Sequence, residues 1–267
     1  MAIIDAHTHC WPDALAPRVI DTLAPKIDID DRTVADGTMR GLIEQMDEAG
    51  IDRCIVLPVA TKPTQVDTIN GWLLPYLDSE RVIPFAAIHP DMDHPKERID
   101  ALAAAGFRGI KLHTLSQRFR PQEERMFPFY EAAIDNDLIM TFHTGAGLEY
   151  PDIYGSPSDF DAFFERFPYE KTVLAHLGGT RTVYHDPLPT SNRPGYLDLA
   201  WLIGNCSDES LLECVRTHGV DRVLFATDSP WKSMRHDVEY LRNVGFRPDE
   251  LEAIFHGNAV RLLGPEV

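Results

Sequence analysis

Two histidines one residue apart, His7 and His9, end a short apolar run near the start of the chain. Side chains alternate between the two faces of a β-strand, so both imidazoles lie on one face if this run is a strand. Imidazole nitrogens are ligands for zinc and other transition metals. The pair therefore predicts half of a metal site. Asp5 would share this face and orient His7, and Trp11 is either a wall of the site or a packing residue.

Further polar side chains stand at the ends of later apolar runs, namely Lys111, His113, His143, His176 and Asp228. A lone histidine in an apolar run is usually a core residue with satisfied hydrogen bonds. Burying this many titratable groups together is costly unless a divalent cation accepts their lone pairs. We therefore interpret the set as a metal centre, provided that the fold brings these residues together.

Eight apolar runs are predicted to be β-strands, at residues 3–9, 53–57, 82–88, 107–113, 138–143, 172–176, 196–200 and 222–228. Helical spacing separates them, as in residues 39–49, where Gly50 ends the predicted helix. Alternating strands and helices indicate parallel strands with helical crossovers, and about eight such units close a barrel. We predict an α/β fold, a single-domain (β/α)8 TIM barrel over residues 1–267. A doubly wound open sheet is the alternative.

In such a barrel the carboxyl ends of the strands converge on one mouth, where catalytic groups collect. Residues far apart in the sequence, such as His7 and Asp228, thereby become neighbours. The stretch from Gly178 to Gly195 contains three prolines and is the longest irregular connection. We expect it to form a loop over the site.

The composition excludes several classes of protein. The 267 residues carry a formal net charge of -17, whereas nucleic-acid binding needs a clustered basic surface. No window approaches the roughly 20 apolar residues of a membrane span, and the N-terminus lacks a signal-peptide pattern. The four cysteines contain no C-x-x-C pair, which favours free thiols in a reducing compartment. We predict a cytoplasmic protein with a small-molecule substrate and no nucleic-acid or membrane partner.

The ordered motifs resemble the amidohydrolase superfamily, closest to the amidohydrolase-related branch that includes aminocarboxymuconate-semialdehyde decarboxylase, lactonases and hydratases. The motifs are His7-x-His9, GIKLH at 109–113, FHTG at 142–145, AHLGG at 175–179, FATDSP at 225–230 and GNAVRLL at 257–263. The resemblance implies that His7, His9 and His143 are metal ligands. It also implies that Asp228 binds the metal or its water, and that His176 is an acid/base. Relatives often dimerise, so the resemblance leaves a homodimer open.

Three imidazoles and a carboxylate would hold one divalent ion with an open position. This ligand set favours zinc, and manganese, iron and cobalt are also compatible with it. Such an ion lowers the pKa of bound water to about 7. Asp228 can then accept the proton of the water, and His176 can stabilise the oxyanion or protonate the leaving group.

The leading hypothesis is therefore a metal-dependent hydrolase that cleaves a small amide, ester or lactone. A non-oxidative decarboxylase or hydratase of a small aromatic or muconate-like acid, with the same metal site, is the alternative. A barrel that binds a metabolite without turnover is a third hypothesis.

Three residues are candidates for substrate binding, each with an alternative. Lys111 shares a strand face with His113 and can point into the barrel as a cation for a substrate carboxylate. The resemblance also allows a carbamylated lysine between two metals, and the side chain could instead extend to solvent. His113 either contacts substrate or supports another residue. Arg181 either binds a substrate carboxylate or is an ordinary solvated arginine.

Overall fold

The computed structural model describes residues 1–26, 35–145, 154–179 and 193–264. The strands are β1 (Ile4–Thr8), β2 (Arg53–Val56), β3 (Val82–Pro84), β4 (Ala86–Ala87), β5 (Gly109–His113), β6 (Ile139–His143), β7 (Thr172–Leu174), β8 (Tyr196–Asp198) and β9 (Val223–Leu224). Each lies within one of the eight predicted runs. The strand prediction is therefore confirmed, with one difference in the third run.

Helices follow the strands along the chain. They are α1 (Ala16–Leu23), α2 (Met39–Ala49), α3 (Val66–Leu73), α4 (Pro95–Ala105), α5 (Thr114–Gln117), α6 (Phe127–Asp135), α7 (Pro157–Arg166), α8 (Ala175–Gly178), α9 (Asp208–His218), α10 (Met234–Asn243), α11 (Pro248–Glu252) and α12 (Asn258–Leu263). The α2 prediction is confirmed at both ends, because Thr38 accepts a hydrogen bond from the N–H of Gly41 and Gly50 adopts a left-handed φ of 69°. No helix in these described ranges is long and apolar enough to cross a membrane.

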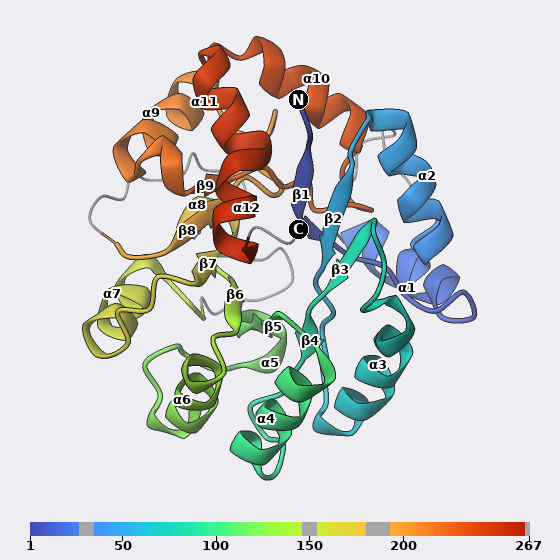
Figure 1. Ribbon diagram of the computed structural model, residues 1–267, viewed down its shortest axis with the longest axis vertical. Helices are drawn as coiled ribbons and strands as arrows, with labels where there is room; N and C mark the ends of the chain where they lie inside the picture. The colour runs from blue at the N-terminus through green and yellow to red at the C-terminus, as the bar shows by residue number, and fades with distance from the viewer. Residues whose placement is uncertain (27–34, 146–153, 180–192, 265–267) are drawn as a thin grey trace.

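All strand pairs are parallel, and the strands form two sheets, with the orders β1-β2-β3 and β4-β5-β6-β7-β8-β9. The third predicted strand is split between them at Phe85. At the other junction, Ala6 N–H donates to Phe225 O at 2.9 Å and Asp228 N–H donates to His7 O at 2.9 Å. The strands thus follow the order of an α/β barrel without forming one continuous sheet, and Figure 1 shows them in the centre with helices around them.

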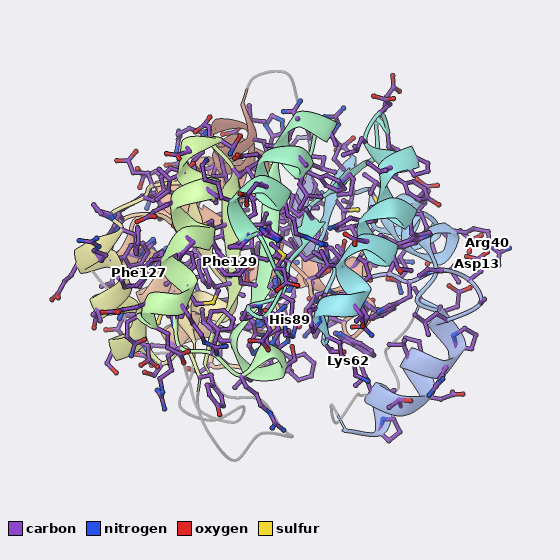
Figure 2. All side chains as sticks on the ribbon, turned by 90° about the horizontal axis from the view of Figure 1, so that it is seen from below. Asp13, Arg40, Lys62, His89, Phe127 and Phe129 are labelled. Carbon is purple, nitrogen blue, oxygen red and sulfur yellow. The ribbon has the colours of Figure 1, made fainter. Side chains whose placement is uncertain are left out.

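Apolar side chains fill both sides of the strands. One buried cluster packs the strands against the surrounding helices, and Figure 2 shows α6, α4 and α3 side by side there, with Phe129 of α6 labelled. A second cluster joins Ile4 of β1 and Phe85, which lies between β3 and β4, to Leu262 of α12. Arg108, just before β5, donates to the carbonyl of Leu263 at 3.1 Å. The α12 helix therefore packs at the amino ends of the strands and leaves their carboxyl ends for the site.

Gly109 makes room for the buried ring of Phe85. A Cβ atom at Gly109 would lie 2.4 Å from Cε2 of Phe85, whose side chain is fully buried. We expect Gly109→Ala to lower the free energy of unfolding by about 1–3 kcal/mol through overpacking, measured by urea denaturation. Gly71→Ala in α3 is the control, because a Cβ atom there meets nothing within 4 Å. An unchanged urea midpoint for Gly109→Ala would contradict this packing.

Candidate metal centre

His7, His9 and Asp228 come together at the carboxyl ends of the strands. The Nε2 atoms of the two histidines are 3.2 Å apart, and Oδ1 of Asp228 lies 3.2 Å from Nε2 of His9 and 3.6 Å from Nε2 of His7. Among the described residues, these three form the group of possible metal ligands whose donor atoms all lie within 4.8 Å of one another. The prediction that both histidines share a face is confirmed, although the register of β1 shifts between Asp5 and Thr8.

Both histidines turn a lone pair toward this group. Nδ1 of His7 lies 2.9 Å from Oδ2 of Asp198, and Nδ1 of His9 lies 2.7 Å from the carbonyl oxygen of Leu57. Because a carbonyl or carboxylate oxygen accepts, each neutral ring carries its proton on Nδ1 and its lone pair on Nε2. Burial, together with the charge of Lys111, holds the pKa of His7 well below its ordinary value. The ring is therefore neutral and able to bind a metal.

Asp228 supplies the negative charge. Burial by itself would raise its pKa, but the charges of His7, His9 and His176, when these rings carry a second proton, lower the pKa below the ordinary range. The carboxylate is therefore ionised and can bind a cation or accept a proton. Its backbone has a left-handed φ of 70°, a conformation that is unfavourable for a residue with a Cβ atom. The hydrogen bond from Asp228 N–H to His7 O fixes this backbone beside β1.

His143 and His176, at the ends of β6 and β7, form a second pair. Nδ1 of His176 donates to the carbonyl of Ala200 at 2.9 Å, and Nε2 of His176 lies 3.1 Å from Nδ1 of His143. With the proton of His176 on Nδ1 alone, its Nε2 accepts, so that Nδ1 of His143 carries the proton and Nε2 of His143 carries the lone pair. This Nε2 atom is buried and has no hydrogen-bond partner among the described residues. A buried lone pair of this kind is suited to binding a cation.

The two histidine pairs are adjacent, because the ring centroids of His7 and His176 are 5.4 Å apart. His143 is nevertheless not a member of the three-residue ligand group within the described chain. Its role as a ligand and the role of His176 as an acid/base remain predictions. The donor set of two imidazoles and a carboxylate, with the unpartnered Nε2 of His143 nearby, fits a divalent metal ion.

His113 stacks on His143, with centroids 4.1 Å apart and ring planes 12° apart. Imidazole lone pairs lie in the ring plane, so two stacked rings cannot both point at one ion at bonding distance. Nδ1 of His113 accepts from the N–H of Ser116 at 3.3 Å. Burial and the charge of Lys111 keep the pKa of His113 well below its ordinary value. This geometry agrees with a supporting role, and a substrate contact remains a prediction.

Lys111 points into the barrel, as one of the sequence hypotheses predicts. The side chain is only 1% exposed, and Nζ lies 3.3 Å from Nε2 of His7. The alternative in which Lys111 extends to solvent is therefore wrong. Burial lowers the pKa of Lys111 to about 8, although the charges of Asp198 and Asp228 act in the opposite direction. A buried ammonium group thus stands beside the candidate ligands.

Asp198 is a site residue that the sequence reasoning missed. Its Oδ2 atom is the partner of the His7 ring, the role expected for Asp5. The carboxylate of Asp5 instead accepts from Thr227 Oγ1 at 2.6 Å and from the backbone N–H of His7 at 3.0 Å. Asp5 therefore holds the backbone of His7, whereas Asp198 contacts the ring. The carboxylate in the middle of the otherwise mostly apolar run 196–200 was the signal that could have identified Asp198.

Two tryptophans flank the centre on one side. The rings of His9 and Trp11 are stacked with centroids 6.3 Å apart, and Trp231 lies 5.7 Å from Trp11. Trp231 was not singled out from the sequence, although it follows the FATDSP motif directly. The two indoles give this side of the centre an aromatic surface.

Arg181, the third candidate for substrate binding, lies outside the described residues. Most of the predicted loop between Gly178 and Gly195 also lies outside them. The role of Arg181 in binding a substrate carboxylate stays a prediction.

A family model described as "Amidohydrolase" matches residues 4–264 of the chain. No curated protein matches the chain. Among solved structures, an uncharacterised TIM-barrel protein from Bordetella bronchiseptica is similar, with a TM-score of 0.78, 20% identity and 98% of each chain covered.

Two further similar structures are named for an activity. One is a dihydroxybenzoic acid decarboxylase from a Polaromonas species with bound manganese, with a TM-score of 0.69, 19% identity and coverage of 98% of this chain and 96% of that chain. The other is a protein from Pseudomonas putida assigned as a 2-pyrone-4,6-dicarboxylic acid hydrolase, with a TM-score of 0.71, 17% identity and coverage of 100% and 98%. At these identities the likeness concerns the fold.

Proposed function

The chain belongs to the amidohydrolase family, and we propose that it is a metal-dependent hydrolase of a small amide, ester or lactone that bears a carboxylate. The observation that carries this proposal is the group of His7, His9 and Asp228, with ligand atoms within 4.8 Å of one another. Its two imidazoles present Nε2 lone pairs, and its carboxylate is ionised. These are the donors that a divalent ion binds, and they favour zinc, with manganese as a second candidate.

His7, His9 and Asp228 would hold the ion, and His143 would join them through Nε2. When bound, a divalent ion lowers the pKa of a water molecule and polarises a carbonyl group. Asp228 accepts the proton of the attacking water, because its carboxylate is ionised and nearly buried. His176 is anchored through Nδ1 to Ala200 O, so Nε2, which lies 3.1 Å from Nδ1 of His143, is the nitrogen that would exchange a proton with the leaving group.

Lys111 is the proposed binding group for a substrate carboxylate. Its ammonium group is buried and lies 3.3 Å from Nε2 of His7, so an anion bound to it would sit next to the metal ligands. Charge-assisted hydrogen bonds of this kind are stronger than neutral ones. The aromatic surface formed by Trp11 and Trp231 would contact the apolar part of the substrate.

Lys111→Met tests this assignment, because methionine retains much of the apolar chain and removes the charge. We expect KM for carboxylate-bearing substrates to rise about 10–100-fold, since a hydrogen bond to a charged group is worth about 1.5–3 kcal/mol. The KM of a neutral ester should change much less. Lys96→Met changes an exposed lysine and is the control. Equal loss on charged and neutral substrates would count against the carboxylate assignment.

A panel of substrates tests the reaction type. It should include 2-pyrone-4,6-dicarboxylate, which is a lactone with two carboxylates, simple amides and esters that carry a carboxylate, and a dihydroxybenzoate. Hydrolysis of a lactone, ester or amide by the metal-loaded protein, with no release of carbon dioxide from the acids, supports the proposal. If the protein hydrolyses none of the lactone, ester and amide substrates, the proposed hydrolase function is refuted for these classes.

Non-oxidative decarboxylation is the second candidate, and the buried position of Lys111 favours it. A cation beside the metal ligands would hold a carboxylate near the ion, which is also the arrangement that loss of carbon dioxide needs. The Polaromonas decarboxylase of similar fold acts on such an acid. Release of carbon dioxide from the dihydroxybenzoate, without hydrolysis of any lactone or ester, would establish this candidate in place of the first.

A further inference from the structure

Asp198, the last residue of β8, is completely buried, and both of its carboxylate oxygens have partners. Oδ2 lies 2.9 Å from Nδ1 of His7. Oδ1 accepts hydrogen bonds from the backbone N–H groups of His176, at 2.9 Å, and Ala200, at 3.1 Å. One carboxylate therefore contacts a candidate metal ligand on β1 and the backbone of the candidate acid/base.

The contact with His7 determines which nitrogen of the ring carries the proton. Burial raises the pKa of Asp198, but Oδ1 accepts two backbone N–H groups, as a carboxylate oxygen does. In the carboxylate form Oδ2 only accepts, so Nδ1 of the neutral His7 ring donates. The lone pair then lies on Nε2, which is 3.2 Å from Nε2 of His9 and 3.6 Å from Oδ1 of Asp228. The opposite tautomer would place a hydrogen atom at the position where a metal ion has to bind.

The contacts with the backbone determine where His176 lies. His176 and Leu177 have left-handed φ values of 57° and 52°, which residues with a Cβ atom rarely adopt. Asp198 holds the N–H of His176, while Ala200 O accepts from Nδ1 of the same residue. The N–H of Ala200 binds Asp198 as well. The backbone and the ring of His176 are thus fixed by the turn that begins at Asp198.

We infer that Asp198 is a positioning residue, which fixes the Nδ1–H tautomer of His7 and the backbone of His176 at the same time. A metal ligand and the histidine proposed to exchange protons then keep one relative arrangement. The inference deepens the proposed function and rests on it for the role of the metal. The tautomer of His7, by contrast, can be measured in protein without metal.

Asp198→Asn is the sharpest variant, because it keeps the shape of the side chain and reverses one hydrogen bond. The amide oxygen can still accept from the N–H groups of His176 and Ala200, which turns the NH2 group toward Nδ1 of His7. Because an NH2 group only donates, Nδ1 has to accept and the ring proton moves to Nε2.

Long-range proton–nitrogen NMR spectra of metal-free protein labelled with 15N-histidine report this tautomer. We expect His7 to carry its proton on Nδ1 in the wild type and on Nε2 in Asp198→Asn, with its signals assigned through His7→Gln. The affinity for Mn2+, followed by the paramagnetic resonance signal of the free ion, should fall about 10–100-fold in Asp198→Asn.

Asp159→Asn is the matched control. It changes another buried aspartate, which caps α7 and binds Arg120. We expect this control to lower the unfolding temperature while leaving the His7 tautomer and the Mn2+ affinity unchanged. A purely structural role of Asp198 would give the same result as the control, and would overturn the inference.

A wild-type His7 ring that carries its proton on Nε2 would also overturn the inference, and this spectrum decides the matter even if Asp198→Asn does not fold. Failure of the proposed function gives a different result. In that case the wild-type protein does not bind Mn2+, whereas the His7 tautomer still shows whether Asp198 positions the ring.

Discussion

Removal of divalent ions with a strong chelator abolishes turnover, and readdition of Zn2+ or Mn2+ restores it. The reason is that Asp228 and His176 can move protons but cannot polarise a carbonyl group, which the ion does. Because such an ion contributes several kcal/mol to transition-state stabilisation, we expect a loss of at least about a thousandfold. The measurement is the rate on the substrate identified by the panel, before and after chelation.

The unfolding temperature provides a second measure of the same site. An ion that binds only the folded state stabilises it by about 2.7 kcal/mol at a concentration one hundred times Kd. Wild-type protein should therefore unfold at a higher temperature with Mn2+ than without it. His9→Ala removes one candidate ligand and should lose most of this increase. Full activity of the chelated wild type would contradict the proposed mechanism.

Asp228→Asn lowers turnover by about 10²–10⁴-fold while retaining much of the metal. The amide oxygen can still bind an ion, but an amide cannot accept the proton of the attacking water, and general base catalysis is worth about this factor. Rates and metal content should be measured on the same preparation. If Asp228→Asn turned over substrate at the wild-type rate, Asp228 would not be the base.

A loss of metal equal to the loss of rate would assign Asp228 a role in binding alone. Asp159→Asn again serves as the control, because Asp159 is buried in the cap of α7 and is not among the candidate ligands. Its rate should equal that of the wild type. A rate reduced as strongly as in Asp228→Asn would indicate general destabilisation.

The main features of the fold were predictable because they depend on periodic patterns. Apolar runs identified the strands, and the spacing of residues 39–49 with Gly50 identified α2 and its end. The third strand was predicted as one run from 82 to 88, but it breaks after Pro84. Proline has no N–H for the ladder, so the break agrees with a signal that was present in the sequence.

The sequence predicted which strand ends carry the candidate site residues. It did not predict which of their side chains contact one another. Alternation placed His7 and His9 on one face, and the barrel placed Asp228 beside them. The sequence could not show that His143 would contact His176, since that depends on ring orientation. Asp198 and His7 are 191 positions apart, and no local pattern links a strand end to a particular ring across the barrel.

A crystal structure of the protein grown with Mn2+ tests the central claim most directly, through the anomalous scattering of manganese. We predict one strong peak about 2.0–2.2 Å from Nε2 of His7, Nε2 of His9 and a carboxylate oxygen of Asp228. The same map shows whether Nε2 of His143 is a fourth ligand. A peak bound by other residues, or none between these three at saturating Mn2+, would contradict the account.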